Sequence, residues 1–158
     1  MSKVPSLYVV HPDLPVKNLK EFVAYAKSKP GQLNYGSAGN GSAGHLAFEY
    51  LKMVSEIFVL HVPYRGTGPM LTDLMSGRLD AASVGAPALL QFIKAGRLRC
   101  IATGTSTRLA QLPDVATVAV DTALAVGNTG PEFDAFIKAE QARWKPVIVR
   151  AQIKPDGA

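Results

Sequence analysis

Short apolar stretches alternate with amphipathic helical patterns along most of this chain of 158 residues. The apolar stretches have the length and composition of strands and occupy Ser6–His11, Leu33–Ser37, Ile57–Val62, Leu79–Val84 and Leu98–Thr103. Helical patterns fill the intervals, and the connections are short. A repeated strand–helix–strand order with short connections predicts an α/β fold, with a Rossmann-like parallel sheet and flanking helices.

Capping and breaking residues mark the ends of the predicted helices. Asn18 and Glu21 have capping-box spacing, and Ser42 is suited to cap the second helix. Thr67 or Gly68 is expected to cap the third helix, and Pro87 to open the fourth. Residues 105–130 show turn signals without a sustained period, and a last helix is predicted beyond them, with Phe133, Phe136, Ile137 and Trp144 on one side and a break at Pro146.

Composition excludes several classes of protein. The chain is 47% hydrophobic and 18% charged, which is typical of a globular domain. No apolar run reaches the length of a membrane span, and the run Leu7–Val10 is too short for a signal peptide. The sequence as written therefore predicts a cytoplasmic location if Met1 is the native start. The net charge of +5 comes from scattered bases, so no nucleic-acid partner is expected.

The glycine-rich loop between the second strand and the second helix nearly fits three known motifs. Residues 39–44 match G-x-G-x-x-G, but no acid follows at about 20 residues, where a dinucleotide site needs one. Gly36 and Gly41 have P-loop spacing, but Ser42 stands where that loop needs Lys. Neither Ser37 nor Ser42 has the flanking glycines of a nucleophile elbow.

The other reactive side chains form no catalytic pattern in the sequence. The three histidines lack metal-ligand spacing, and His61 in its apolar strand reads as a satisfied structural histidine. Asp73 and Asp80 read as surface or cap residues, and Cys100 as a small buried hydrophobe. We therefore expect no enzyme activity, no metal and no cofactor.

The strand-to-helix junctions are the strongest candidates for a binding site. In a parallel sheet these junctions share one edge, and each helix N-terminus offers unpaired N–H groups and a partial positive charge. Such an edge suits a carboxylate, while the competing interpretation is ordinary helix capping with glycine in tight turns. The candidate ligand-binding residues are Ser37, Ala38, Gly39, Asn40, Gly41, Ser42, Tyr64, Gly66, Thr67, Gly85, Ala86 and Pro87.

Four stretches resemble the substrate-binding proteins of tripartite tricarboxylate transporters, also called Bug receptors: LNYGSAGNGSAGHLA, HVPYRGTGPMLTDLMSGRLD, ALLQFIKAGRLRCIATGTSTR and LPDVATVAV. The resemblance runs from about Pro5 to Val120 and resumes near Gly130. It implies one lobe of a periplasmic-binding-protein type II fold. It also implies a periplasmic receptor that closes on a di- or tricarboxylate, an acidic amino acid or an aromatic acid, and passes it to a membrane permease.

The chain is about half the length that this resemblance implies. It is similar to the second lobe at residues 1–120, has a short junction at 121–130, and resembles the C-terminal helix at 131–158. Val84 stands where the family often has Asp. Without a first lobe the ligand cannot be enclosed, so we expect weak carboxylate binding at best.

Two other functions compete with this interpretation. A non-transporting remnant or self-associating module is the first, because loss of a lobe would expose apolar surface that a homodimer could cover. A nucleotide-dependent enzyme is the second, and the missing ribose-binding acid argues against it.

Overall fold

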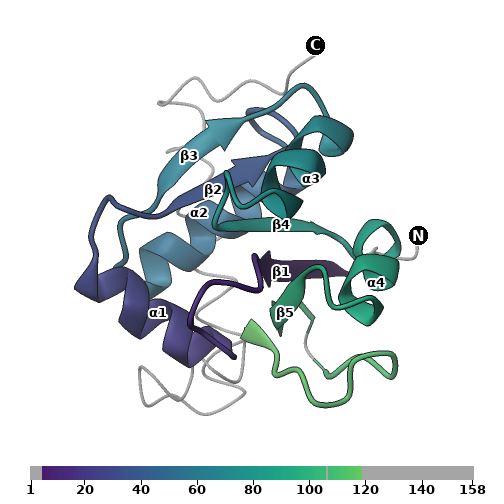
Figure 1. Ribbon diagram of the computed structural model, residues 1–158. Coiled ribbons are helices and arrows are strands. Elements are labelled where there is room, and N and C mark those ends of the chain that lie inside the picture. The colour runs from purple at the N-terminus through teal and green to yellow at the C-terminus, as the bar shows by residue number, and fades with distance from the viewer. Residues whose placement is uncertain (1–4, 106, 119–158) are drawn as a thin grey trace.

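The computed structural model describes residues 5–105 and 107–118, and these form a sheet covered on both faces by helices (Figure 1). The sheet has five strands in the order β3-β2-β4-β1-β5. The elements are, in chain order, β1 (Ser6–Val10), α1 (Leu19–Ser28), β2 (Asn34–Ser37), α2 (Ala43–Ser55), β3 (Leu60–Pro63), α3 (Thr67–Met75), β4 (Ala81–Gly85), α4 (Ala86–Lys94) and β5 (Arg99–Thr103).

The α/β class is confirmed, but the sheet is not wholly parallel as the sequence predicted. β2 pairs in parallel with β3 and β4, whereas β1 is antiparallel to both β4 and β5. The register places Ser6 opposite Gly85 and Leu7 opposite Thr103. Because β1 pairs with strands that come much later in the chain, the local β1–α1–β2 connection does not fix its direction.

Alternate residues of each central strand face two separate cores. Tyr8 and Val10 pack with α1 and α2, whereas Leu7 and Val9 pack with α3 and α4. The two helix pairs therefore cover opposite faces of the sheet (Figure 1). Cys100 lies in the second core at 7% exposure, which confirms its predicted role as a small buried hydrophobe.

Most helix boundaries match the capping signals. Asn18 Oδ1 accepts a hydrogen bond from Glu21 N–H at 2.9 Å, and Ser42 caps α2 through His45 N–H at 3.3 Å. The predicted cap of α3 is wrong by one residue, because Gly66 rather than Thr67 or Gly68 is the N-cap. Gly66 has φ 101°, a turn conformation that favours glycine, and helical geometry begins directly after it.

The predicted buried strand at residues 57–62 is also corrected. β3 starts only at Leu60 and is an edge strand, with Leu60 48% exposed and the preceding Phe58 57% exposed. A run of apolar residues indicates a strand, but it does not show whether other elements cover both faces of that strand. Met53, at the C-terminal end of α2, is exposed as well.

The predicted junction at 121–130 and C-terminal helix at 131–158 lie outside the described residues. Within the described part, no helix is long and apolar enough to cross a bilayer. No group of three or more metal-ligating side chains gathers among residues 5–105 and 107–118.

Phe48 is the residue through which α2 is packed onto the sheet, and its removal should be costly. Its ring is fully buried, stacked on Tyr35 with centroids 4.1 Å apart and packed edge-on against Phe22 at 6.1 Å. Phe48→Ala should lower the free energy of unfolding by about 3–5 kcal/mol in urea denaturation. Phe58→Ala removes the same atoms from an exposed site and should change it by less than about 0.5 kcal/mol. Similar losses in the two variants would contradict this packing.

Candidate ligand-binding site

The carboxyl ends of three neighbouring strands bring the predicted binding loops to one edge of the sheet. β2 ends at Ser37, opposite Pro63 of β3, and β4 lies on the other side of β2. Tyr64 N–H donates to Ser37 O at 3.0 Å, and Gly66 N–H donates to Ala38 O at 3.2 Å. The first two loops are therefore in direct contact, and the third follows the adjacent strand.

The loop from Ser37 to Ser42 is held by its own backbone and by one buried hydroxyl. Ser37 Oγ donates to Gly39 O at 3.0 Å and accepts from Gly39 N–H at 3.2 Å. Gly39 and Gly41 have φ values of 135° and 77°, which favour glycine. Ser37 is fully buried, so its hydroxyl fixes the shape of the loop, while Asn40 at the loop tip is exposed.

The N-terminus of α2 supplies donors directly after this loop. Ser42 Oγ accepts one first-turn amide, that of His45, and the helix itself provides no acceptor for the N–H groups of Ala43 and Gly44. Ala43 is exposed, and Gly44 lies so close to the carbonyl of Ser83 that an added Cβ would be 2.0 Å from that oxygen. This contact presses the first turn of α2 against β4.

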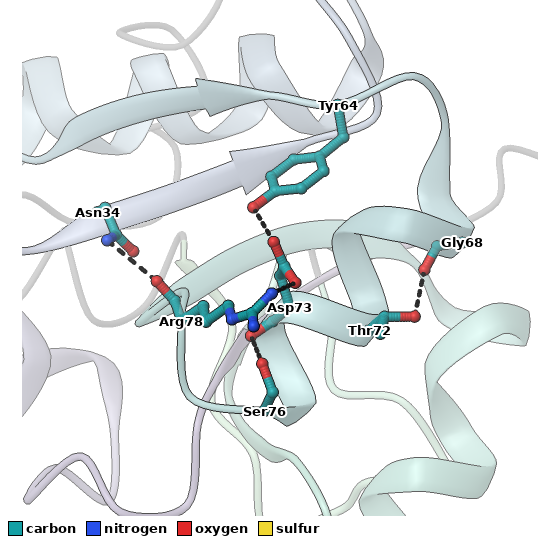
Figure 2. A network of polar contacts seen from close by, with 7 residues as sticks. All are labelled: Asn34, Tyr64, Gly68, Thr72, Asp73, Ser76 and Arg78. Atoms are coloured by element: carbon teal, nitrogen blue, oxygen red, sulfur yellow. Dashed lines mark hydrogen bonds and ion pairs between the residues drawn. The ribbon is translucent and has the colours of Figure 1, made fainter.

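Tyr64, a predicted hydrogen-bond donor to a ligand, is already engaged elsewhere. Its hydroxyl donates to Asp73 Oδ2 at 2.8 Å, and Asp73 also pairs with Arg78 at 3.3 Å (Figure 2). Burial and the hydrogen bond to Asp73 raise the pKa of Tyr64. The Tyr64 hydroxyl therefore ties the loop after β3 to α3, and Asp73 is a half-buried, engaged residue rather than the surface or cap residue that the sequence predicted.

The N-termini of α3 and α4 differ in what they offer. No side chain caps α3, and a Cβ added at Gly68 would meet nothing within 4 Å, so its first-turn amides lie beside open space. In α4, Ala86 N–H donates to Pro5 O at 2.9 Å, and Pro87 has no N–H. The third junction therefore supplies fewer donors than the sequence suggested.

His61 is a structural histidine, as predicted, but its partners were missed. Its Nε2 lies 2.7 Å from Ser37 Oγ, and its ring stacks on His45 at a centroid distance of 4.0 Å. Burial, then the neighbouring His45, lowers the pKa of His61 to about 4, so the ring is neutral at pH 7. The strand register places His61 opposite Tyr35, and Ser37 follows two residues later on the same face of β2. Knowledge of that register would have indicated the contact between His61 and Ser37.

Asp80 is likewise structural. Its Oδ2 accepts from Asn34 N–H at 2.9 Å, and its own N–H donates to Asn34 Oδ1 at 2.9 Å. Together with the engaged Asp73, this leaves no pair of carboxylates arranged for acid–base chemistry in the part of the chain that the structure describes. The edge instead presents backbone N–H groups, small side chains and hydroxyls.

This fold and edge define one lobe of a bilobal solute-binding protein. The family described as Tripartite tricarboxylate transporter family receptor matches residues 1–132. The chain belongs to that family, which consists of solute-binding receptors rather than enzymes. The matched stretch spans 33% to 36% of the length of four curated relatives, which are 33% to 36% identical to this chain.

Solved receptors share the architecture over most of the chain. The periplasmic binding protein BugD is 29% identical, with a TM-score of 0.72, over 75% of this chain and 40% of its own. Rpa4515 of R. palustris, solved with adipate, is 26% identical with a TM-score of 0.76, over 96% of this chain and 67% of its own. MatC from Rhodopseudomonas palustris, with bound malate, is 28% identical with a TM-score of 0.71, over 80% of this chain and 42% of its own.

The contact between Gly44 and Ser83 should make Gly44 intolerant of a side chain. Because the obstructing atom is a backbone carbonyl, Gly44→Ala should push the first turn of α2 away from β4 and lower the free energy of unfolding by about 1–3 kcal/mol. Gly68→Ala lies at the equivalent position of α3, where a Cβ would meet only the following Pro69, and should therefore cost less than Gly44→Ala. Equal effects in urea denaturation would contradict the close approach.

His61 should make stability depend on pH. Its pKa falls from an ordinary 6.5 to about 4 in the folded chain, so the unfolded chain binds more protons between these values. The contribution of His61 to the free energy of unfolding should therefore decrease as pH is lowered from 6.5 to about 4.

Urea denaturation at a series of pH values tests this dependence. His61→Gln should show a shallower slope than the parent chain in that window, and the same slope above about pH 7.5. An unchanged slope between pH 6.5 and 4 in the variant would show that other groups account for the dependence.

Proposed function

We propose that residues 1–120 are the second lobe of a solute receptor and bind a small carboxylate at the edge formed by the loops after β2, β3 and β4. One observation carries this proposal: the N-termini of α2 and α3 meet at one edge, where the loops Ser37–Ser42 and Tyr64–Thr67 are hydrogen-bonded to each other. Adipate and malate, found in two solved relatives, indicate the class of ligand.

The electrostatics of this edge favour an anion. The first-turn N–H groups of Ala43 and Gly44 in α2, and of Thr67 and Gly68 in α3, point out of their helix ends and add to the positive end of each helix dipole. Arg65, within the second loop, is exposed and forms no ion pair with another described residue. A carboxylate at this edge would meet donors without having to displace an acid.

A carboxylate held by this lobe alone would be bound weakly. Charge-assisted hydrogen bonds contribute roughly 1.5–3 kcal/mol each. Association costs an estimated 4–15 kcal/mol, so two or three such bonds on an open edge give a dissociation constant near or above ~1 mM. In a receptor with both lobes, closure over the same loops would exclude water and raise the affinity. Periplasmic location and transfer of the ligand to a membrane permease are part of this proposal.

Self-association is a second candidate function, and exposed apolar side chains favour it. Phe58, Leu60 and Met53 are 57%, 48% and 37% exposed at the β3 edge and the end of α2. An uncovered edge strand with apolar side chains is a common site of pairing between chains. A stable dimer in sedimentation experiments that is lost in Leu60→Lys would support this candidate, and a monomer would exclude it.

The carboxylate proposal is tested by an amide NMR titration with malate, adipate, citrate, glutamate and nicotinate. Saturable shifts should be confined to residues 37–44, 64–68 and 85–87. NADP, included as a control, should give none of them. Shifts spread over the whole surface, or none from any carboxylate in a well-dispersed spectrum, would exclude a carboxylate site on this lobe.

One substitution removes a proposed donor without disturbing the helix. Ala43 is exposed at the first position of α2, where proline is favoured, and Ser42 before it has φ −62° and ψ 157°, which proline accepts. Ala43→Pro should weaken carboxylate binding by about 10-fold or more, as the loss of one charge-assisted bond implies. Ala43→Ser keeps the N–H and should bind as the parent chain does. Equal affinity of the two variants would exclude this amide from the site.

A further inference from the structure

Two imidazole rings lie face to face beneath the loop Ser37–Ser42. His45 of α2 and His61 of β3 have ring centroids 4.0 Å apart and planes 6° from parallel. His61 also stacks on Tyr35 at 4.9 Å, and Tyr35 stacks on Phe48 at 4.1 Å. His45 is only 6% exposed and His61 is half-buried, so the stack extends the aromatic core toward the edge of the sheet.

Each ring also forms a hydrogen bond to the loop. Gly41 N–H donates to His45 Nδ1 at 3.0 Å, while His61 Nε2 lies 2.7 Å from Ser37 Oγ. His45 N–H further donates to Ser42 Oγ at 3.3 Å. The beginning and the end of the loop are therefore both attached to one stacked pair.

The hydrogen bond from Gly41 defines the protonation state of His45. An imidazole nitrogen accepts a hydrogen bond only when it carries no proton, so Nδ1 is the acceptor and a neutral ring carries its proton on Nε2. A protonated ring has donors at both nitrogens. Protonation of His45 would therefore place an N–H against the Gly41 N–H and remove this attachment.

We propose that His45 is a positioning residue of the carboxylate site: stacked on His61, its neutral ring holds Gly41 and fixes the loop, and its protonation releases the loop and weakens carboxylate binding. This inference rests on the proposed function, since it assigns regulation by pH to the same site. It requires no contact between either imidazole and the ligand.

The charged groups around the stack act on its protonation in opposite directions. Glu49, one turn after His45, accepts from Tyr35 Oη at 2.6 Å and from Lys52 Nζ at 2.7 Å. Burial raises the pKa of Glu49, but these hydrogen bonds and the nearby charges of Lys52 and His45 lower it overall, so Glu49 is a carboxylate that favours a proton on the stack. Lys52 lies 5.6 Å from the Tyr35 ring and opposes a second positive charge in the stack. Burial, and then the neighbouring His45, lowers the pKa of His61 to about 4; Glu49 opposes this shift and Lys52 adds to it.

A metal ion does not explain the pair. Imidazole binds metals through lone pairs in the ring plane, and two parallel stacked rings do not direct these lone pairs to one point. Among residues 5–105 and 107–118 no third ligand joins them. The hydrogen bonds to Gly41 and Ser37 already occupy one nitrogen of each ring.

The experiment is an NMR titration of the whole chain with malate at several pH values between about 5 and 8. It compares the parent chain with His45→Asn, whose amide oxygen can accept from Gly41 but does not titrate, and with His45→Phe, which keeps the stacking but cannot accept. The parent chain should lose affinity as pH falls. His45→Asn should keep only the pH dependence of malate itself. His45→Phe should bind about 2- to 10-fold more weakly at all pH values, as loss of one hydrogen bond implies.

A second readout is independent of any ligand. Imidazole nitrogen shifts should report His45 protonated at Nε2 near neutral pH, and the Gly41 amide shift should titrate together with His45. If no carboxylate binds at any pH but Gly41 titrates with His45, the proposed function fails while the attachment of the loop stands. If Gly41 does not follow His45, or if His45→Asn retains the excess pH dependence of the parent chain, the inference is wrong. Dispersed amide spectra of both variants verify that they fold.

Discussion

The packing of α2 against the sheet is the interaction on which the rest of this lobe depends. Phe48 stacks on Tyr35 in the middle of the helix, and the absence of a Cβ at Gly44 lets the first turn approach Ser83 of β4. These two contacts determine how closely α2 approaches the sheet and how its axis is oriented. As a result, its N-terminal amides lie at the sheet edge, next to the ends of β2 and β4. The loop Ser37–Ser42 is shaped by the same packing, through the imidazoles of His45 and His61.

Polar contacts inside the lobe are satisfied mainly by backbone groups and by short side-chain pairs between neighbouring elements. Asn34 and Asp80 exchange two hydrogen bonds between β2 and the start of β4, and Tyr64 and Asp73 connect the loop after β3 to α3. Such pairs leave little polar side-chain surface for ligand chemistry at these positions. The proposed recognition of a carboxylate at this edge would therefore rest on backbone N–H groups at helix N-termini. That arrangement is consistent with a family in which solved members hold both adipate and malate.

The sequence was sufficient to predict the type and order of the elements, because apolar periodicity and capping residues act locally. It could not predict the direction of β1, which depends on its pairing with β4 and β5, far along the chain. Nor could it predict that Phe58 and Leu60 are exposed, since a missing neighbour at β3 leaves no trace in the strand itself. At the site, the three junctions followed from the α/β pattern. The partners of Tyr64, Ala86 and His61 did not, because they come from distant segments: Asp73, Pro5, and the stacked His45 with Ser37.

The antiparallel strand β1 also has a consequence for how this lobe is made. Its two neighbours are β4 (Ala81–Gly85) and β5 (Arg99–Thr103), so a ribosome has to reach Gly85 before one edge of β1 can be paired and Thr103 before the other. At synthesis rates of about 5–20 residues per second, that delay is on the order of seconds. Throughout it, the apolar run Leu7–Val10 has no sheet to join. Pairing of β1 is therefore a late event in the synthesis of this lobe.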